Sequence, residues 1–410
     1  MFESLQIKGF RLLWMSTVCL AFGTQMQNIG RGWLIYDMTS SPMALTWVMI
    51  SYMVPAAIFS LVGGVIADRM NKKSLMVISQ LLNTMAMFVL SYVTYIGEVT
   101  FSHFIFFGVF NGILGSVSMP ARFAIVPELV GDNNVVNASA LQTATYNLSR
   151  IAGPIFAGGL IAAFAAGDTT SAQGVGLVFF LISMLLLISS IFPLFLDYQG
   201  TSTDVKKTPL EDFAEGFQFL KKEKVITGLI FIGLVPSIFG STVNFLLPAF
   251  NQEVILGGPE ELGFLSAGMG LGALIGSLLL AKLSDLGSKG QIMFLASYGW
   301  AITIAIFAFS GHLFAAIVAG ALTALFHNFF GSLNMSLTQI LTPQFVRGRV
   351  ASLILMVNGL MPLGAIPIGI IAEVFNIQTA LFFGSLMMLA STFILGLFYP
   401  EIRKIDKGHG

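Results

Sequence analysis

The chain has few charged residues, and this shortage excludes the usual soluble folds. Only 10% of its 410 residues are charged, whereas 56% are hydrophobic. Soluble domains carry about 25% charged residues, so this chain has too little charge to build a water-soluble surface. The expected solvent is therefore the lipid bilayer, where one helical span needs about 20 apolar residues.

Other residues that carry chemistry are also scarce. Cys19 is the only cysteine, which excludes a disulfide within the chain, and the four histidines form no metal-binding cluster with it. The sequence has no phosphate-binding loop and no spacing that supports a serine–histidine–aspartate triad. The net charge is zero, so nothing favours nucleic acid as a partner. We expect no metal, no cofactor and no enzymatic activity.

What the chain has instead is long apolar runs separated by short polar breaks. Their length and uniform apolarity predict helices, because the strands of a membrane barrel would alternate in polarity. The sequence thus predicts an all-α membrane protein with twelve transmembrane helices. The expected spans are 10–36, 43–67, 74–97, 101–121, 136–166, 171–196, 225–250, 260–281, 290–311, 313–336, 349–374 and 378–399.

Lysine and arginine are distributed unevenly between these spans. Seventeen of the twenty lie in the two terminal tails or in loops on the same side of the predicted spans as the tails. The loops on the opposite side carry no lysine or arginine and several acids. Because basic residues are retained on the cytoplasmic side of a membrane, we expect both termini in the cytoplasm.

The longest polar interruption, residues 197–224, leaves six spans on each side of it. Within it, Thr208 and Pro209 open an amphipathic segment, which predicts a short helix on the cytoplasmic membrane surface. We therefore predict an N-terminal six-helix bundle over 1–196, a cytoplasmic linker over 197–224 and a C-terminal six-helix bundle over 225–410. A repeat of six-helix units with parallel topology is typical of transporters.

A charged motif follows the second span, and its aspartate has a counterpart, Asp285, after the eighth. The motif resembles the loop signature G-x-x-x-D-R-x-G-R/K-R/K of the major facilitator superfamily. Its residues are Gly64, Asp68, Arg69, Asn71, Lys72 and Lys73. Asn71 stands where the family has glycine, and we expect it to keep the left-handed turn. The resemblance implies two pseudo-symmetric bundles, with the loops at Asp68 and Asp285 acting as gates for alternating access.

The resemblance extends along the chain to one branch of that superfamily. Residues 10–48, 119–130 and 137–159 are similar to bacterial exporters related to the enterobactin exporter. The pair Gly153-Pro154 before Gly158-Gly159 resembles an antiporter pattern of the fifth span, although one residue longer. The resemblance implies a monomer in the bacterial inner (plasma) membrane. It also implies proton-coupled efflux, by antiport, of a small amphipathic drug-like or siderophore-like molecule.

Polar residues inside the spans are the candidates for substrate contact, because each is costly in a bilayer. Arg150 lies near the middle of the fifth span and shares a helix face with Tyr146 and Asn147. The full set expected to line a substrate cavity is Gln25, Gln27, Asn28, Arg31, Asn111, Tyr146, Asn147, Arg150, Asn244, His327, Asn328 and Asn358.

Several alternatives stay open at this point. Arg150 suits a substrate contact or a structural arginine held by carbonyl groups, and Arg31 suits the cavity or the outer headgroups, which long basic side chains can reach. His327 suits proton coupling or plain packing. Arg122 and Glu128 are expected to form an ion pair or a loop anchor at the cytoplasmic surface, with a role in gating as the alternative. No carboxylate lies at mid-membrane, so a passive facilitator or a lipid-moving transporter of the same fold is the alternative function.

Overall fold

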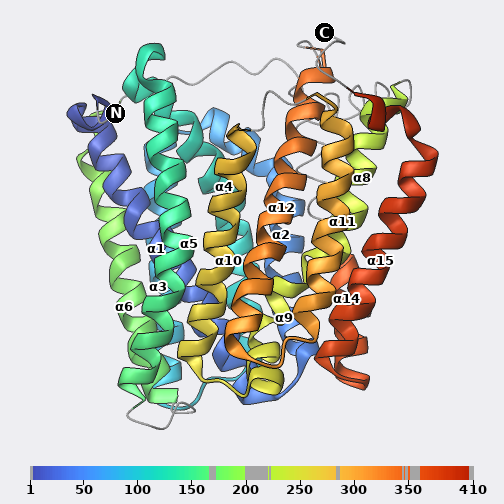
Figure 1. The fold of residues 1–410 in the computed structure, drawn as a ribbon. Helices are drawn as coiled ribbons and strands as arrows, with labels where there is room; N and C mark the ends of the chain where they lie inside the picture. The colour runs from blue at the N-terminus through green and yellow to red at the C-terminus, as the bar shows by residue number, and fades with distance from the viewer. Residues whose placement is uncertain are drawn as a thin grey trace. The chain divides into compact units, whose positions relative to one another are not determined.

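The computed structural model describes residues 3–165, 172–198, 223–282, 287–343 and 361–405, with 220, 346 and 350 (Figure 1). Side chains are described throughout these ranges except at 61–69, 132, 281, 362 and 363. The predicted amphipathic helix of the linker, Asp285 and Asn358 lie outside the described residues, as do the side chains of the motif residues Gly64, Asp68 and Arg69.

The described residues form helices, and ten helical segments among them are long and apolar enough to cross a membrane. Two further helices occupy the places of the remaining predicted spans. They are α1 (Lys8–Thr39) and the shorter α14 (Pro362–Val374). The predicted all-α membrane fold is confirmed, and the described helices are consistent with twelve spans.

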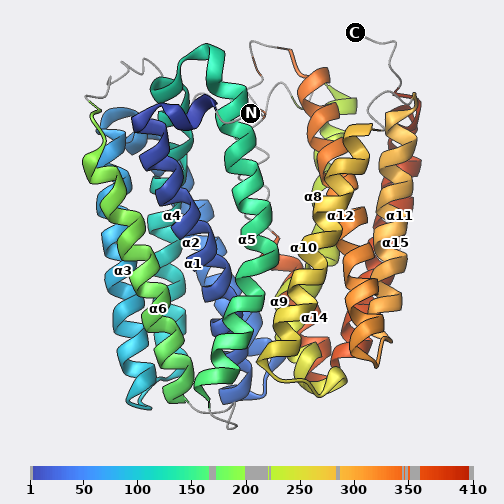
Figure 2. The same ribbon diagram turned by 60° about the vertical axis from the view of Figure 1, so that its left-hand side comes forward.

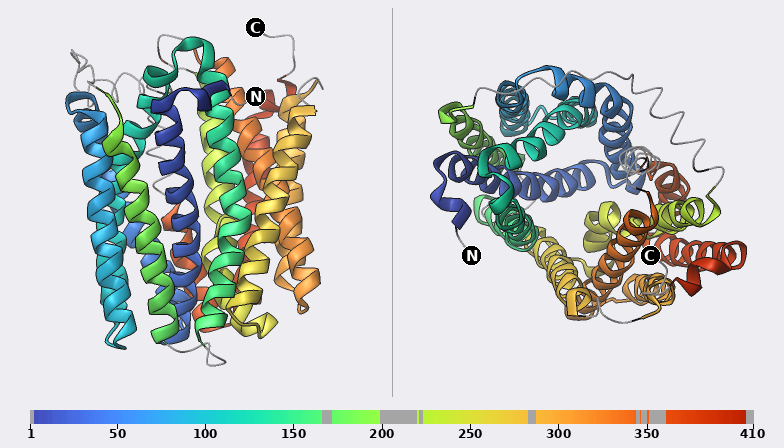
Figure 3. Two further views of the ribbon diagram at one scale, coloured as in Figure 1. Left: turned by 90° about the vertical axis from the view of Figure 1, so that its left-hand side faces the viewer. Right: turned by 90° about the horizontal axis from the view of Figure 1, so that it is seen from above.

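Contacts divide the chain into two compact units. The first consists of Met1–Ser40, Trp47–Lys206 and Gly257–Ala267, and the second of Ser41–Thr46, Lys207–Leu256 and Gly268–Gly410. The helices of each unit run roughly along one axis, so they are seen close to end-on from above (Figure 3). The division of the sequence into bundles at the 197–224 linker stays a prediction.

In the first unit, α1 packs along α5 and α6, and α3 packs along α4 and α6 (Figure 2). Besides α1, the helices of this unit are α2 (Pro42–Arg69), α3 (Lys72–Tyr95), α4 (Phe101–Val130), α5 (Val135–Phe164) and α6 (Ala172–Ile191). Apolar side chains from α1, α3, α4 and α5, together with Leu196 after α6, form a core near one end of the unit. Its members are Phe10, Leu13, Leu75, Met76, Ala121, Ile125, Val126, Val130, Ala138, Leu141 and Leu196.

Side-chain contacts bring several chain turns to the same end of this unit. The Ser4 hydroxyl donates to Asn137 Oδ1 at 2.7 Å, which joins the N-terminal tail to the start of α5. The Lys73 ammonium donates to the Leu196 carbonyl oxygen at 2.6 Å, which joins the start of α3 to the chain after α6. The tail and these turns therefore meet at one end, as expected for helices that cross a membrane up and down.

The start of α10 (Pro259–Lys282) also belongs to the first unit, where it crosses α5 at small residues. A Cβ atom on Gly158 would lie 2.3 Å from the Pro259 carbonyl oxygen, and one on Gly263 would lie 2.7 Å from the Pro154 carbonyl oxygen. Small residues thus let two helix backbones touch, which is how membrane helices gain van der Waals contact. The glycine and proline of the predicted antiporter pattern have this packing role here.

In the second unit, α11 packs along α12 and α15, and α15 packs along α8. The predicted span 225–250 is interrupted, because α8 ends at Gly240, where the indole of Trp300 lies against the backbone. The helices of the second unit are α8 (Lys224–Gly240), α9 (Thr242–Phe250), α10 from Gly268 onward, α11 (Lys289–Ala308), α12 (Leu313–Leu341), α14 and α15 (Ile377–Phe398). A π-helical turn, Asn251–Ile255, extends α9, and a 3₁₀ turn, Pro400–Lys404, follows α15.

The start of α2, within Ser41–Thr46, belongs to this second unit. Glu373 of α14 accepts hydrogen bonds from the Ser41 hydroxyl at 2.8 Å and from the Met43 backbone N–H at 3.2 Å. A carboxylate is favourable at this position, because the first N–H groups of a helix have no partner inside the helix.

Gly112 should tolerate no side chain, because α2 and α4 touch there. A Cβ atom would lie 2.3 Å from the Tyr52 carbonyl oxygen and 3.2 Å from the Ala56 nitrogen. We expect Gly112→Ala to lower the free energy of unfolding by about 1–3 kcal/mol, as overpacking does. Gly159→Ala is the matched control, since nothing lies within 4 Å of its Cβ position. Thermal unfolding of both variants in detergent checks this, and equal melting temperatures would refute the close contact.

Candidate functional site

The polar residues of α1 divide into an accessible pair and a buried pair. Asn28, which is exposed, donates to Gln25 Oε1 at 3.4 Å. Gln27 and Arg31 are only 5% and 8% exposed. The Arg31 guanidinium lies 5.0 Å from the ring centre of Phe107 on α4, a distance that allows a cation–π contact. The burial of the Arg31 side chain argues against a contact with lipid headgroups.

Arg122 of α4 lies at the centre of a buried polar network that sequence reasoning missed. Its guanidinium donates to Thr17 Oγ1 at 2.9 Å, to Gln80 Oε1 at 2.8 Å and to Ser16 Oγ at 3.2 Å. Ser189 of α6 joins the network, because its hydroxyl accepts from the Gln80 amide and donates to the Ser16 carbonyl oxygen at 2.6 Å. Four helices are thus tied together around one cation.

The predicted pair of Arg122 with Glu128 is wrong. Arg122 is 3% exposed, and its partners are neutral oxygens. Glu128 instead pairs with Lys72 at the start of α3 and accepts a hydrogen bond from the Tyr198 hydroxyl. Burial, and then the hydrogen bond and charge of Glu128, raise the pKa of Tyr198, so its hydroxyl stays a donor at neutral pH. This cluster closes the end of the first unit.

The motif residues that are described at this end act as local anchors. Asn71 is the N-cap of α3, and its side chain accepts from the Ser74 N–H at 3.2 Å. The expected left-handed turn is wrong, because Asn71 has an extended backbone with φ −62° and ψ 116°. Asparagine is a favoured N-cap, which explains its presence where the family pattern has glycine.

Gln142, Tyr146 and Arg150 lie along one face of α5 at intervals of four residues. The Gln142 amide nitrogen and the Tyr146 hydroxyl are buried without a hydrogen-bond partner. Tyr146 lies near Arg122, so this part of the face adjoins the buried network. Polar groups buried without partners are rare, and each one calls for a functional or structural explanation.

Arg150 stands at the accessible end of this face, with the half-buried Asn147 beside it. Its side chain is exposed, and it makes no hydrogen bond or ion pair with any residue that the structure describes. A structural arginine would be held by carbonyl groups, as the neutral oxygens hold Arg122. The surroundings of Arg150 therefore favour a contact with something outside the chain.

Asn111 has a different position from these residues. Its amide donates to Asn83 Oδ1 on α3 at 2.9 Å, so it joins α3 to α4. That bond occupies one of its polar groups, although the side chain is only half-buried.

In the second unit, the predicted residues are spread over α9 and α12. Asn244 of α9 is exposed. His327 of α12 stacks on Trp300 of α11, with ring centres 4.3 Å apart and planes inclined by 26°. Asn328 accepts from the Ser332 hydroxyl at 3.3 Å. The stacking on Trp300 favours a packing role for His327, because both rings present their apolar faces to each other.

No group of three or more histidine, cysteine, aspartate or glutamate side chains that could hold a metal ion occurs within the described parts of the chain. None of the described aspartate and glutamate side chains is buried. The polar chemistry of the described spans is therefore carried by arginines, amides and hydroxyl groups.

Comparisons with known proteins show similarity to membrane transporters and exporters. A profile of the family described as transmembrane secretion effectors matches residues 1–407. The staphyloferrin A transporter of Staphylococcus aureus is 26% identical over 404 residues, which cover 96% of this chain and 98% of that protein. The enterobactin exporter of Shigella boydii is 27% identical over 293 residues, which cover 72% of this chain and 68% of that protein.

Solved structures share the fold. A nucleoside transporter superposes with a TM-score of 0.72 at 16% identity, covering 99% of this chain and 100% of that one. A POT family transporter in complex with 5-aminolevulinic acid gives 0.76 at 13% identity, covering 96% of each chain. At such identities the likeness concerns the arrangement of the helices.

The buried network around Arg122 should show strong energetic coupling. Gln80→Leu removes the acceptor 2.8 Å from the guanidinium and leaves a buried N–H without a partner, which costs about 1–3 kcal/mol. Arg122→Met added to Gln80→Leu removes the unpaired charge, so the double variant should be more stable than Gln80→Leu alone. A double-mutant cycle from thermal unfolding in detergent measures the coupling. Additive effects would show that the two side chains act independently.

Proposed function

Because this chain belongs to the transmembrane secretion effector family of the major facilitator superfamily, it is a multi-pass membrane transporter, and we propose that it exports a siderophore-like small molecule. The family match confirms the resemblance that the loop motif predicted. Two relatives that span most of the chain are named for siderophores, staphyloferrin A and enterobactin. The observation that carries the proposal on the chain itself is the accessible Arg150 on α5, which has no partner among the described residues.

Arg150 suits a ligand that presents anionic oxygen atoms. Siderophores bind ferric iron through such oxygens, and a guanidinium recognises them with paired, charge-assisted hydrogen bonds. The Tyr146 hydroxyl and the Gln142 amide nitrogen are buried without a partner among the described residues, and an opening of this face during transport would make them further donors. The distance along the helix from Gln142 to Arg150 is about 12 Å, enough to contact a small molecule at several points.

The transport cycle we propose is alternating access. The bundles 1–196 and 225–410 rock about a central substrate site, and the loops at Asp68 and Asp285 gate one side of it. The molecule works as a monomer in the bacterial inner membrane, with both termini in the cytoplasm. This orientation is supported by the lysines and arginines at the ends of the spans, which bacterial membranes retain on the cytoplasmic side.

The driving force of transport distinguishes proton-coupled export from a second candidate function. Proton antiport needs a group that titrates within the membrane, and among the described residues no aspartate or glutamate is buried. This observation favours the alternative, a passive facilitator or a lipid-moving transporter of the same fold. His327 is a titratable group within the described span α12 of the second unit, where it stacks on Trp300.

Replacing Arg150 should abolish substrate recognition without unfolding the protein. We expect Arg150→Met to reduce export at least tenfold, since a lost hydrogen bond to a charged group costs about 1.5–3 kcal/mol. Arg150→Lys keeps the charge without the paired donors and should give an intermediate rate. Secretion of enterobactin and of staphyloferrin A, measured in cells that lack their own exporters, reports the effect.

The matched control for Arg150 is Lys282→Gln, which neutralises an exposed cation in the last turn of α10. It should secrete like the unchanged protein. Detergent-extracted protein of equal amount and equal melting temperature separates loss of recognition from loss of folding. Unchanged secretion by Arg150→Met at equal protein level would show that Arg150 does not contribute to substrate recognition.

Proton coupling, the first of the two candidates, predicts that a proton gradient drives export. In inverted membrane vesicles, acidification of the lumen should produce substrate uptake against its concentration gradient, and a protonophore should stop it. Uptake that follows only the substrate's own gradient, with and without the protonophore, would support the passive facilitator instead. Vesicles without the protein give the background.

A further inference from the structure

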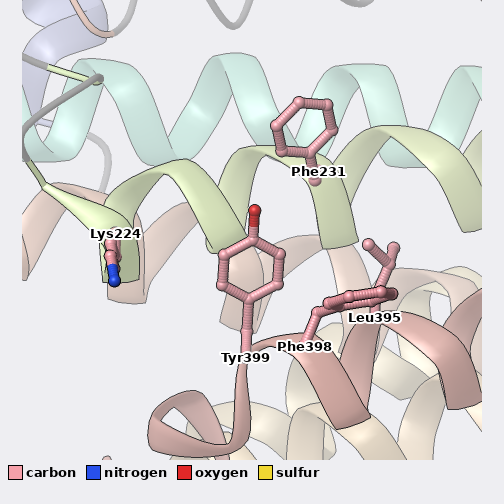
Figure 4. Close-up of a pocket in the computed structure, with 5 residues that line it drawn as sticks. All are labelled: Lys224, Phe231, Leu395, Phe398 and Tyr399. Atoms are coloured by element: carbon pink, nitrogen blue, oxygen red, sulfur yellow. The ribbon is translucent and has the colours of Figure 1, made fainter.

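A groove opens between the beginning of α8 and the end of α15, away from the residues discussed above (Figure 4). Its lining residues are Lys224, Phe231, Leu395, Phe398 and Tyr399. Its volume of about 420 Å³ lies within the range of about 300–1,000 Å³ of small-molecule sites. All the lining residues belong to the second unit, so the groove is contained within it.

The groove has an amphipathic lining. Lys224 lies at one end in the close-up, Tyr399 lies next to it, and Phe231, Leu395 and Phe398 form the apolar remainder (Figure 4). Phe231 is 45% exposed and Phe398 is 75% exposed. An anionic headgroup would suit the lysine, and a hydrocarbon chain would suit the aromatic and leucine side chains.

The polar end of the groove has unused hydrogen-bond donors. Neither the Lys224 ammonium nor the Tyr399 hydroxyl has a hydrogen-bond or ion-pair partner among the described residues. The Tyr399 ring is held in place, because it lies against the backbone of α8 at Gly228, where a Cβ atom would be 2.5 Å from the ring. The tyrosine therefore forms part of the groove wall and is fixed beside the lysine.

The surrounding charge is positive. Gly290 contacts Ile402, which brings Lys289 to the same end of the unit as the 3₁₀ turn that carries Arg403 and Lys404. Glu223 and Glu401 are the acids of these same segments, so the cations outnumber them. Basic residues beside a membrane surface attract anionic lipids, by about 1 kcal/mol for each lysine or arginine.

We propose that this groove binds one anionic phospholipid from the surrounding leaflet. The Lys224 ammonium donates to its phosphate, and one acyl chain lies along the Tyr399 ring and along Phe231, Leu395 and Phe398 (Figure 4). Tyrosine and lysine are typical residues of the membrane interface, where the polar tip contacts headgroups and the apolar body contacts chains. The ligand differs from the transported molecule, and its site does not depend on the proposed substrate.

Native mass spectrometry of the full chain tests this lipid site. The protein is released from detergent containing equal amounts of phosphatidylglycerol and phosphatidylcholine with identical acyl chains. We expect more phosphatidylglycerol than phosphatidylcholine to stay bound. Lys224→Gln should lower the retained phosphatidylglycerol about fivefold, the factor that corresponds to about 1 kcal/mol. Lys282→Gln removes an exposed cation outside the groove and should retain as much as the unchanged protein.

A second variant tests the apolar part of the groove without changing any charge. Leu395→Trp fills the space for the acyl chain and should also reduce retention of phosphatidylglycerol. Excess inorganic phosphate should displace none of the lipid, since the chain contributes to binding. Equal retention of both lipids, equal losses in Lys224→Gln and Lys282→Gln, unchanged retention in Leu395→Trp, or displacement by phosphate would each overturn the proposal.

Discussion

The low polarity of the bilayer is the constraint on which the described structure depends, because each buried polar group must find its partner inside the protein. Arg122 shows how the first unit meets this demand. Its guanidinium donates hydrogen bonds to the neutral oxygens of Thr17, Ser16 and Gln80, which come from α1 and α3. Ser189 extends the network to α6. The cation thus fixes the relative positions of four helices, a kind of specificity that apolar contact alone does not provide.

Arg122 and Arg150 show how the same residue type acquires different roles. Arg122 is enclosed and bonded, so its replacement would disturb helix packing. Arg150 is accessible and has no described partner, so packing gives no reason for placing a charge there. A cation inside a membrane span is expensive, and where the structure does not use it, transport chemistry is the natural explanation. Tyr146 lies between the two, since it shares a helix face with Arg150 and is near Arg122.

Much of the fold could be predicted from the sequence, because apolar length and charge distribution are properties of the chain itself. The start of α3 at Lys72 and the end of α15 at Phe398 lie within two residues of the predicted spans. The partners of individual polar residues could not be predicted, since they depend on which helix faces meet. Glu128 is six residues from Arg122 in the sequence, yet it pairs with Lys72 across the helix ends. The capping role of Asn71 likewise required the backbone angles.

The positions of the described carboxylates limit how export can be coupled to protons. Glu128 lies at a helix end with Lys72, and Glu373 accepts hydrogen bonds at the start of α2, so both stabilise the ends of helices. Acids used in this way are not available to carry protons through the described spans. If export is proton-coupled, the proton must therefore use a group of another kind, such as the imidazole of His327, or a carboxylate outside the described residues. With the imidazole in that role, the coupling mechanism differs from one in which a single buried acid alternates between proton and substrate.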